Sequence, residues 1–133
     1  MVIGAGQAGL STSHHLKRLG LSHVVLDANA RAGGAWQHRW DSLTMDDVHG
    51  VADLPGAPAP PRGAQRAKDV IPQWYADYER TQGLPVIRPV HVHRVEDRGE
   101  LLEVHAGDRS WLTRTIVNAT GTWTRPFFPH YPG

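Results

Sequence analysis

The first nine residues, Met1 to Gly9, constrain the fold more than any other stretch of the chain. Three apolar residues lead into the pattern Gly4-x-Gly6-x-x-Gly9, and a helical pattern follows as far as Gly20. A second apolar run, Val24 to Leu26, then ends at Asp27. This order of strand, tight turn, helix, strand and acidic tip predicts a dinucleotide-binding βαβ unit.

Each part of this pattern has a physical role in such a unit. The glycines allow the tight turn, the approach of backbone N–H groups to a pyrophosphate, and close packing of helix on sheet. Unpaired amides and the positive end of the helix dipole favour an anion at the helix N-terminus. Asp27, at the end of the next strand, can accept hydrogen bonds from a ribose diol. Glycine-rich turns also occur where only tight packing is needed, but the flanking strands favour the dinucleotide interpretation and leave the dinucleotide open.

Composition limits the classes of function. The chain has 133 residues, 14 basic and 13 acidic side chains, and a net charge of +1, which indicates neither a nucleic-acid nor a membrane surface. It contains no cysteine, so disulfides, thiolate metal sites and a cysteine nucleophile are excluded. There is no apolar run of membrane-spanning length, and we expect a cytoplasmic protein.

Both ends of the sequence look cut. Three residues precede the glycine turn, whereas a strand usually has about five or six. The chain stops at Tyr131-Pro132-Gly133, where a loop would lead to another element. We therefore expect residues 1–133 to be one truncated domain of a longer protein.

A long segment, residues 28–68, interrupts the regular patterns, and loops of this length are generally functional or mobile. Its first half carries Gly33-Gly34-Ala35-Trp36 and Trp40, which could approach and wall a flat ligand; alternatively, it is a surface loop pinned by two packed tryptophans. Its second half, Leu54 to Gly63, is rich in proline and predicts an extended connector.

A second helix is predicted up to Gly83. Asp69 is the expected N-cap and Pro72 fits the first turn. The apolar residues at i, i+3, i+4 and i+7 predict a stripe packed against a sheet: Ile71, Trp74, Tyr75 and Tyr78.

The sequence then changes to short β segments. Residues 85–87 predict a third parallel strand, and three strands between about 90 and 113 predict an antiparallel β-meander. Residues 115–118 predict a strand that returns to the parallel sheet. His91 and His93 share a face of the first meander strand, but no third ligand is in view, so we predict no metal site. The fold class is α/β, a Rossmann-like three-layer domain for FAD or NAD(P) with an inserted three-stranded antiparallel β-meander.

Several motifs in this order resemble the flavin-dependent monooxygenases with two dinucleotide-binding domains, including the FMO-like and Baeyer–Villiger-like enzymes. The resemblance covers the whole chain and corresponds to the N-terminal FAD-binding part of that family. It rests on the glycine turn, Asp27, Gly33-Gly34-Ala35-Trp36, Ala119-Thr120-Gly121 and Arg125-Pro126-Phe127-Phe128-Pro129.

The resemblance implies a set of FAD contacts. It places the pyrophosphate on the glycine turn, the adenosine ribose on Asp27, where the family more often has Glu, and adenine on the backbone of Val92. Gly33, Gly34 and Trp36 would lie along the cofactor towards the flavin, with His49 as a weaker flavin-side candidate. The residues implied in cofactor binding are Gly4, Gly6, Gln7, Ala8, Gly9, Asp27, Gly33, Gly34, Trp36, His49, Val92, Ala119, Thr120 and Gly121.

The resemblance also implies a chemistry for the longer parent protein. Reduced flavin would capture molecular oxygen as a C4a-(hydro)peroxide and oxygenate a small-molecule substrate, with NADPH or NADH as reductant. No second glycine-rich turn for NADPH and no defensible catalytic residue occur in the 133 residues, so we expect this piece alone to bind FAD without turnover.

Two alternatives remain open at this point. The chain could be an FAD- or NAD-binding module of a different flavoprotein reductase, although the lack of cysteine removes a disulfide reductase centre. It could also be a non-catalytic remnant that keeps the fold without the cofactor. In either case apolar surface left uncovered would favour self-association, which size-exclusion chromatography would detect.

Overall fold

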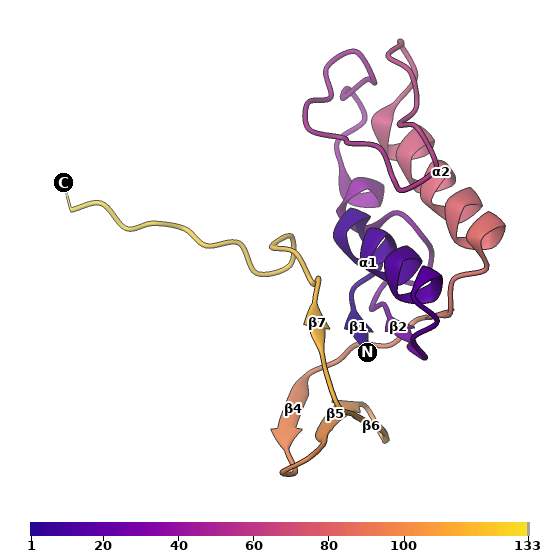
Figure 1. The fold of residues 1–133 in the computed structure, drawn as a ribbon. Coiled ribbons are helices and arrows are strands. Elements are labelled where there is room, and N and C mark those ends of the chain that lie inside the picture. The colour runs from indigo at the N-terminus through magenta and orange to yellow at the C-terminus, as the bar shows by residue number, and fades with distance from the viewer. Residues whose placement is uncertain (133) are drawn as a thin grey trace.

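A four-stranded parallel sheet in the order β3-β2-β1-β7 organises the computed structural model, which describes residues 1–132 (Figure 1). The register pairs Val2 with Val25 and Val117, and Val25 with Val86. All four strands predicted from the sequence are therefore present. Their bounds are β1 Val2–Ile3, β2 Val25–Leu26, β3 Val86–Ile87 and β7 Val117–Asn118.

The two faces of this sheet pack against different layers. Successive residues of a strand point to opposite faces. Val2 and Val25 pack with the buried side chains of the two long helices, such as Leu10 and Tyr75. Ile3 and Leu26 pack with a second cluster that includes the buried meander residues Val104 and Ala106. The predicted three-layer arrangement of helices, parallel sheet and meander is confirmed.

Helix α1, Gln7–Arg18, directly follows the glycine turn. It buries Gly9, Leu10 and Ser13, and the Ser13 hydroxyl lies 2.8 Å from His23 Nε2 on the approach to β2. The helix ends at Arg18, and the C-cap residue Leu19 is 67 % exposed.

Helix α2, Ala67–Gln82, begins two residues before the predicted N-cap Asp69. No side chain caps its N-terminus. Instead, Thr44 and Arg66 form an isolated antiparallel β-bridge, and the Ala67 N–H donates to the Leu43 carbonyl at 2.9 Å. Pro72 consequently lies inside the helix instead of in its first turn. The predicted stripe is confirmed as core packing, with Ile71, Tyr75 and Tyr78 buried and Trp74 half-buried.

The long segment between β2 and α2 is more ordered than its composition predicted. It contains a 3-10 helix, η1, at Gly34–His38, and a second short bridge joins Leu54 to Ala57. Met45 and Leu54 are buried in the helix-side core, the cluster between the helices and the sheet that contains Val2 and Leu10. The Tyr78 hydroxyl donates to the Pro55 carbonyl at 2.9 Å. The proline-rich part of the segment is therefore packed against helix α2 at Leu54 and Pro55.

The meander consists of β4 Arg94–Asp97, β5 Leu102–Ala106 and β6 Arg109–Thr113, all antiparallel. It begins four residues later than the predicted start at Val90, because the Val90 N–H donates to the Asp27 carbonyl at 2.7 Å instead of joining the ladder. His91 and His93 therefore do not share a strand face. Glu96, Glu103 and His105 come close together on this sheet, but Arg98 donates to both carboxylates at 2.6 and 2.8 Å.

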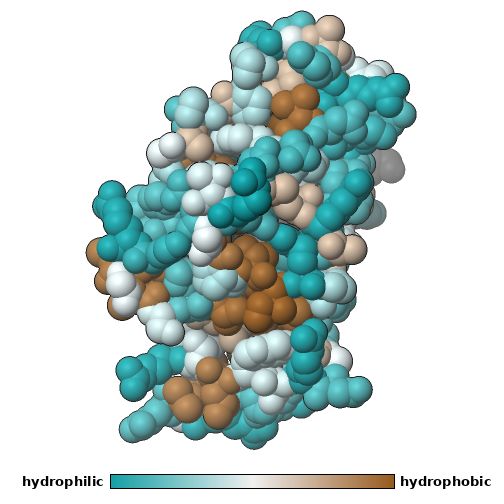
Figure 2. Space-filling model, turned by 90° about the vertical axis from the view of Figure 1, so that its right-hand side faces the viewer, coloured by the Kyte–Doolittle hydropathy of each residue, from teal (hydrophilic) through white to brown (hydrophobic). Residues whose placement is uncertain are grey.

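The surface is mixed in character. Figure 2 shows one face that is mainly hydrophilic, with an apolar patch across its lower half. The exposed apolar side chains of the chain include Leu21, Ile87 and Leu112, together with Phe127 and Phe128 in the C-terminal segment, which runs away from the sheet in Figure 1. Self-association through such surface stays a prediction. Within residues 1–132, neither helix combines the length and apolarity that crossing a lipid bilayer requires.

We predict an alkaline loss of stability from Tyr75. Burial raises the pKa of Tyr75 to about 12. The unfolded chain ionises near pH 10, so the stabilisation is complete below pH 10 and is lost as pH rises towards 12, by roughly 2 to 3 kcal/mol. Urea unfolding at pH 8 and pH 11.5 measures this loss.

The matched variants are Tyr75→Phe and Tyr131→Phe, since Tyr131 is exposed. The first should remove most of the pH dependence, with a remainder from Tyr78, whose pKa is also raised by burial. The second should leave it unchanged. An equal pH dependence in the two variants would contradict the assignment.

Candidate dinucleotide site

The carboxyl ends of β1, β2 and β7 meet at one edge of the parallel sheet. The Gly4 N–H donates to the Leu26 carbonyl at 2.7 Å, and the Ala119 N–H donates to the Ile3 carbonyl at 2.8 Å. These bonds bring the glycine turn, Asp27 and the segment from Ala119 to the same edge. Ligands of open α/β sheets bind at this edge, as the sequence predicted for these three motifs.

Glycines at three positions allow the backbone segments to touch. A Cβ on Gly4, which has a φ of 101°, would lie 2.3 Å from the Ala119 carbonyl oxygen. One on Gly9 would lie 1.9 Å from the Gly4 carbonyl oxygen. One on Gly34 would lie 3.2 Å from Gly6 Cα, so the start of η1 is in close contact with the turn. The glycine turn, the start of η1 and the segment after β7 are therefore in direct backbone contact.

Gly6 differs from these glycines because its missing side chain faces open space, with no atom within 4 Å of a built Cβ. It is also the N-cap of α1, where no side chain caps the helix and no acidic residue occupies the first turn. The amides at the start of this 12-residue helix are left for an external acceptor. The open space at Gly6 beside these amides leaves room for the predicted diphosphate contact, which stays a prediction.

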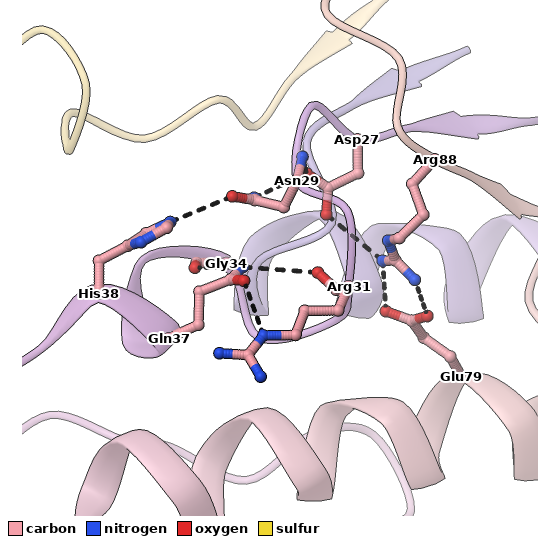
Figure 3. Close-up of polar contacts among 8 residues, drawn as sticks. All are labelled: Asp27, Asn29, Arg31, Gly34, Gln37, His38, Glu79 and Arg88. Atoms are coloured by element: carbon pink, nitrogen blue, oxygen red, sulfur yellow. Dashed lines mark hydrogen bonds and ion pairs between the residues drawn. The ribbon is translucent and has the colours of Figure 1, made fainter.

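Asp27 lies directly after β2 and its side chain is 4 % exposed (Figure 3). Its Oδ1 accepts hydrogen bonds from the backbone N–H and the side-chain amide of Asn29, at 3.1 and 2.9 Å. Its Oδ2 accepts one from Arg88 Nη2 at 3.3 Å. The predicted ribose ligand is therefore also part of a buried polar network.

Arg88 links the sheet edge to helix α2. It follows β3, and its two terminal nitrogens donate to the Glu79 carboxylate at 2.6 and 2.8 Å (Figure 3). Burial alone would lower the pKa of Arg88, but the bonds and charges of Glu79 and Asp27 outweigh it and raise that pKa. The positive charge therefore persists at every pH at which the protein is folded.

Arg39 connects η1 to the segment after β7. Its guanidinium carbon lies 5.1 Å from the Trp36 ring centroid and 4.8 Å from that of Trp123. His38 also stacks on Trp123, with 6.1 Å between the ring centroids and 13° between the planes. Trp36 is half-buried against the helix-side core. These cation–π and stacking contacts hold η1 against the segment that follows β7.

The turn after β7 is organised by Asn118, whose Oδ1 accepts from the Thr120 N–H at 3.2 Å and from the Thr120 hydroxyl at 2.9 Å. Ala119 is half-buried, and Gly121 is exposed with a φ of 65°. Because the Thr120 amide already donates to Asn118, it is not free to donate to a ligand.

The remaining predicted residues surround the site unevenly. Gln7 uses its side chain to donate to the Ala52 carbonyl at 2.8 Å, and Ala8 is exposed on the first turn of α1. His49 is exposed and lines a cavity of about 230 Å³. Val92 is half-buried against the meander-side core. The roles of these residues stay predictions.

Sequence reasoning missed Asn29, Arg88 and Glu79. The contact with the backbone of Asn29 could have been found, because an aspartate side chain often accepts a hydrogen bond from the backbone N–H two residues further on, as Asp27 does here. Arg88 and Glu79 carry no such local signal. A larger open groove of about 750 Å³ on the outer side of α2, lined by residues such as Val70 and Trp74, is separate from the residues of this edge.

Comparison with known proteins gives the family. The model of the family described as pyridine nucleotide-disulphide oxidoreductase matches residues 1–133. The chain belongs to this family. Its fold is the Rossmann-like FAD-binding fold of the solved relatives, and the resemblance predicted from the sequence is confirmed.

Individual relatives match nine tenths or more of this chain and are longer than it. A flavin-containing monooxygenase from Stenotrophomonas maltophilia is 47 % identical with a TM-score of 0.87, over 99 % of this chain and 41 % of its own. An uncharacterized CzcO-like oxidoreductase of Geobacillus kaustophilus is 29 % identical, over 98 % of this chain and 38 % of its own length. The enzyme OTEMO, solved with FAD and NADP, shares the fold at 17 % identity and a TM-score of 0.70, over 90 % of this chain and 25 % of its own. The chain therefore spans about two fifths of the first two relatives.

Proposed function

We propose that this chain is the FAD-binding portion of a flavin-dependent monooxygenase that uses NADPH or NADH. The observation that carries the proposal is the open space at Gly6 beside the uncapped N-terminus of α1, with Asp27 at the next strand end. The names of the relatives support flavin as the cofactor. The family name also includes disulfide chemistry, but a chain without cysteine cannot supply the thiols for it.

Each part of the site has a task in this function. The glycine turn and the amides of α1 would hold the FAD diphosphate, and Asp27 would hold the adenosine ribose. Gly33, Gly34 and Trp36 would lie along the middle of the cofactor towards the flavin. When bound, the reduced flavin supplies the reaction with molecular oxygen, and a small-molecule substrate would be oxygenated in the complete protein. The residues described here bind and orient the cofactor.

A titration with FAD tests the proposal. We expect saturable quenching of flavin fluorescence by the purified chain and its loss in Gly6→Trp, because the indole fills the space for the diphosphate. Ser22→Trp adds the same side chain on an exposed loop before β2 and should bind FAD as the unsubstituted chain does. A folded chain, by circular dichroism, that shows no saturable FAD binding would overturn the proposal.

We further expect FAD binding without NAD(P)H turnover by these 133 residues, since they contain a single Gly-x-Gly-x-x-Gly turn. Loss of absorbance at 340 nm measures the oxidation of NADPH or NADH by the FAD-loaded chain. The rate should equal that of free FAD at the same concentration. Saturable, protein-dependent oxidation would show that the chain carries its own nicotinamide site.

A further inference from the structure

The two oxygens of the Asp27 carboxylate are unequally occupied. A carboxylate has about four acceptor positions, two on each oxygen. Asn29 fills both positions of Oδ1 with its backbone and side-chain N–H groups, whereas Arg88 fills one position of Oδ2. Among the described residues, a single acceptor position therefore stays open, and it lies on Oδ2.

Asn29 cannot easily release the Oδ1 atom of Asp27, because the amide of Asn29 has a second partner that holds it in place. His38 Nε2 lies 3.2 Å from Asn29 Oδ1 (Figure 3). Since the Asn29 amide nitrogen donates to Asp27, its Oδ1 must accept, and the His38 nitrogen carries the hydrogen. The amide is thus fixed between η1 and the end of β2.

Arg88 fixes the second oxygen in a similar way. Its bonds to Glu79 are shorter than its bond to Asp27, so Glu79 sets the plane of the guanidinium. A guanidinium is a rigid planar group. Its fixed plane therefore decides which acceptor position of Asp27 Oδ2 is filled and from which direction a further donor can approach that oxygen. The low exposure of Asp27 leaves little room for a second approach.

Resting on the proposed function, we propose that Asp27 accepts one hydroxyl of the adenosine ribose, on Oδ2, and that Asn29 and Arg88 are positioning residues that restrict it to one. Recognition of both hydroxyls would require an acceptor position on Oδ1, which Asn29 occupies. The chain would therefore distinguish the two ribose hydroxyls from each other.

Competition against FAD by ADP, 2′-deoxy-ADP and 3′-deoxy-ADP tests this proposal, because ADP is the adenosine end of the cofactor. With the unsubstituted chain, we expect one deoxy analogue to bind roughly 10- to 100-fold more weakly than ADP, the loss of one hydrogen bond to a charged group. The other analogue should bind within about threefold of ADP.

Two variants separate positioning from a structural role. Asn29→Ala removes the side-chain amide but keeps the backbone N–H, so it frees one of the two acceptor positions on Asp27 Oδ1. Both deoxy analogues should then bind more weakly than ADP. Arg88→Lys keeps the charge but loses the fork, so the preference between the analogues should fall to about threefold or less. A merely structural change would weaken all three ligands alike. Asp97→Ala removes a similar turn contact, to the Gly99 N–H in the meander, and should leave the preference unchanged.

The possible results are distinct. Equal weakening of both analogues with the unsubstituted chain would show recognition of the whole diol, and equal binding of all three ligands would show no recognition of the ribose by Asp27. Either result, or a failure of ADP to compete with bound FAD, overturns this inference and leaves the proposed function in place. A chain that binds no FAD overturns both.

Discussion

We expect Gly9→Ala to prevent stable folding of the chain. A Cβ at this position would lie 1.9 Å from the carbonyl oxygen of Gly4, which is backbone and cannot rotate away. Relief would require α1 to move off the sheet, at a cost of about 3 kcal/mol or more, a large share of the stability of a small domain. Thermal melting followed by circular dichroism measures the loss.

Gly6→Ala is the matched control, because it adds the same methyl group three residues away. Its Cβ meets no atom within 4 Å, and Gly6 has an extended backbone with a φ of −81°. We expect the melting temperature to change little while FAD binding weakens. Comparable melting of the two variants would show that the contact between α1 and the turn does not limit stability.

Arg88→Met should cause the second large loss. The substitution keeps the length of the side chain but leaves the Asp27 and Glu79 carboxylates buried without their shared cation. Removing one partner from a buried ion pair costs about 3 to 5 kcal/mol. Urea unfolding at pH 7 measures the change in the free energy of unfolding.

Arg80→Met makes the same change on the exposed side of α2, where Arg80 pairs with Asp77 at 2.9 Å. Exposed pairs contribute little to stability, so we expect almost no change in the free energy of unfolding. If Arg88→Met were as mild as this control, the network would have no structural importance.

The parts of the fold that were predictable rest on local patterns. The glycine turn with its flanking strands placed β1, α1 and β2, since Gly4 and Gly9 permit backbone contacts that a side chain would block. The apolar stripe placed α2 against the sheet, because Ile71, Tyr75 and Tyr78 recur at helical spacing. Turn residues separated the meander strands in the same way.

The misplaced boundaries were decided by contacts between distant segments. Helix α2 begins at Ala67 because that residue pairs with Leu43, whereas Asp69 resembled a cap in the local sequence. The meander begins late because Val90 bonds to Asp27. A local pattern carries no information about partners more than twenty residues away.

The candidate site shows the same division. The backbone cradle followed from glycine spacing, but the partners of Asp27 did not. Arg88 is 61 residues from Asp27, and Glu79 lies on a helix whose packing had first to be known. Arg39 and Trp123 meet across a similar separation in sequence. Such side-chain networks depend on the assembled fold.

The strand order has a consequence for how the chain folds. β1 pairs with β2 about two dozen residues later, but its other neighbour is β7, with Val2 facing Val117. Closing a loop of that length is slow relative to forming the local hairpins of the meander. During synthesis the open edge of β1 must therefore wait until β7 has left the ribosome, and this unpaired edge exposes the nascent chain to misassembly in the meantime.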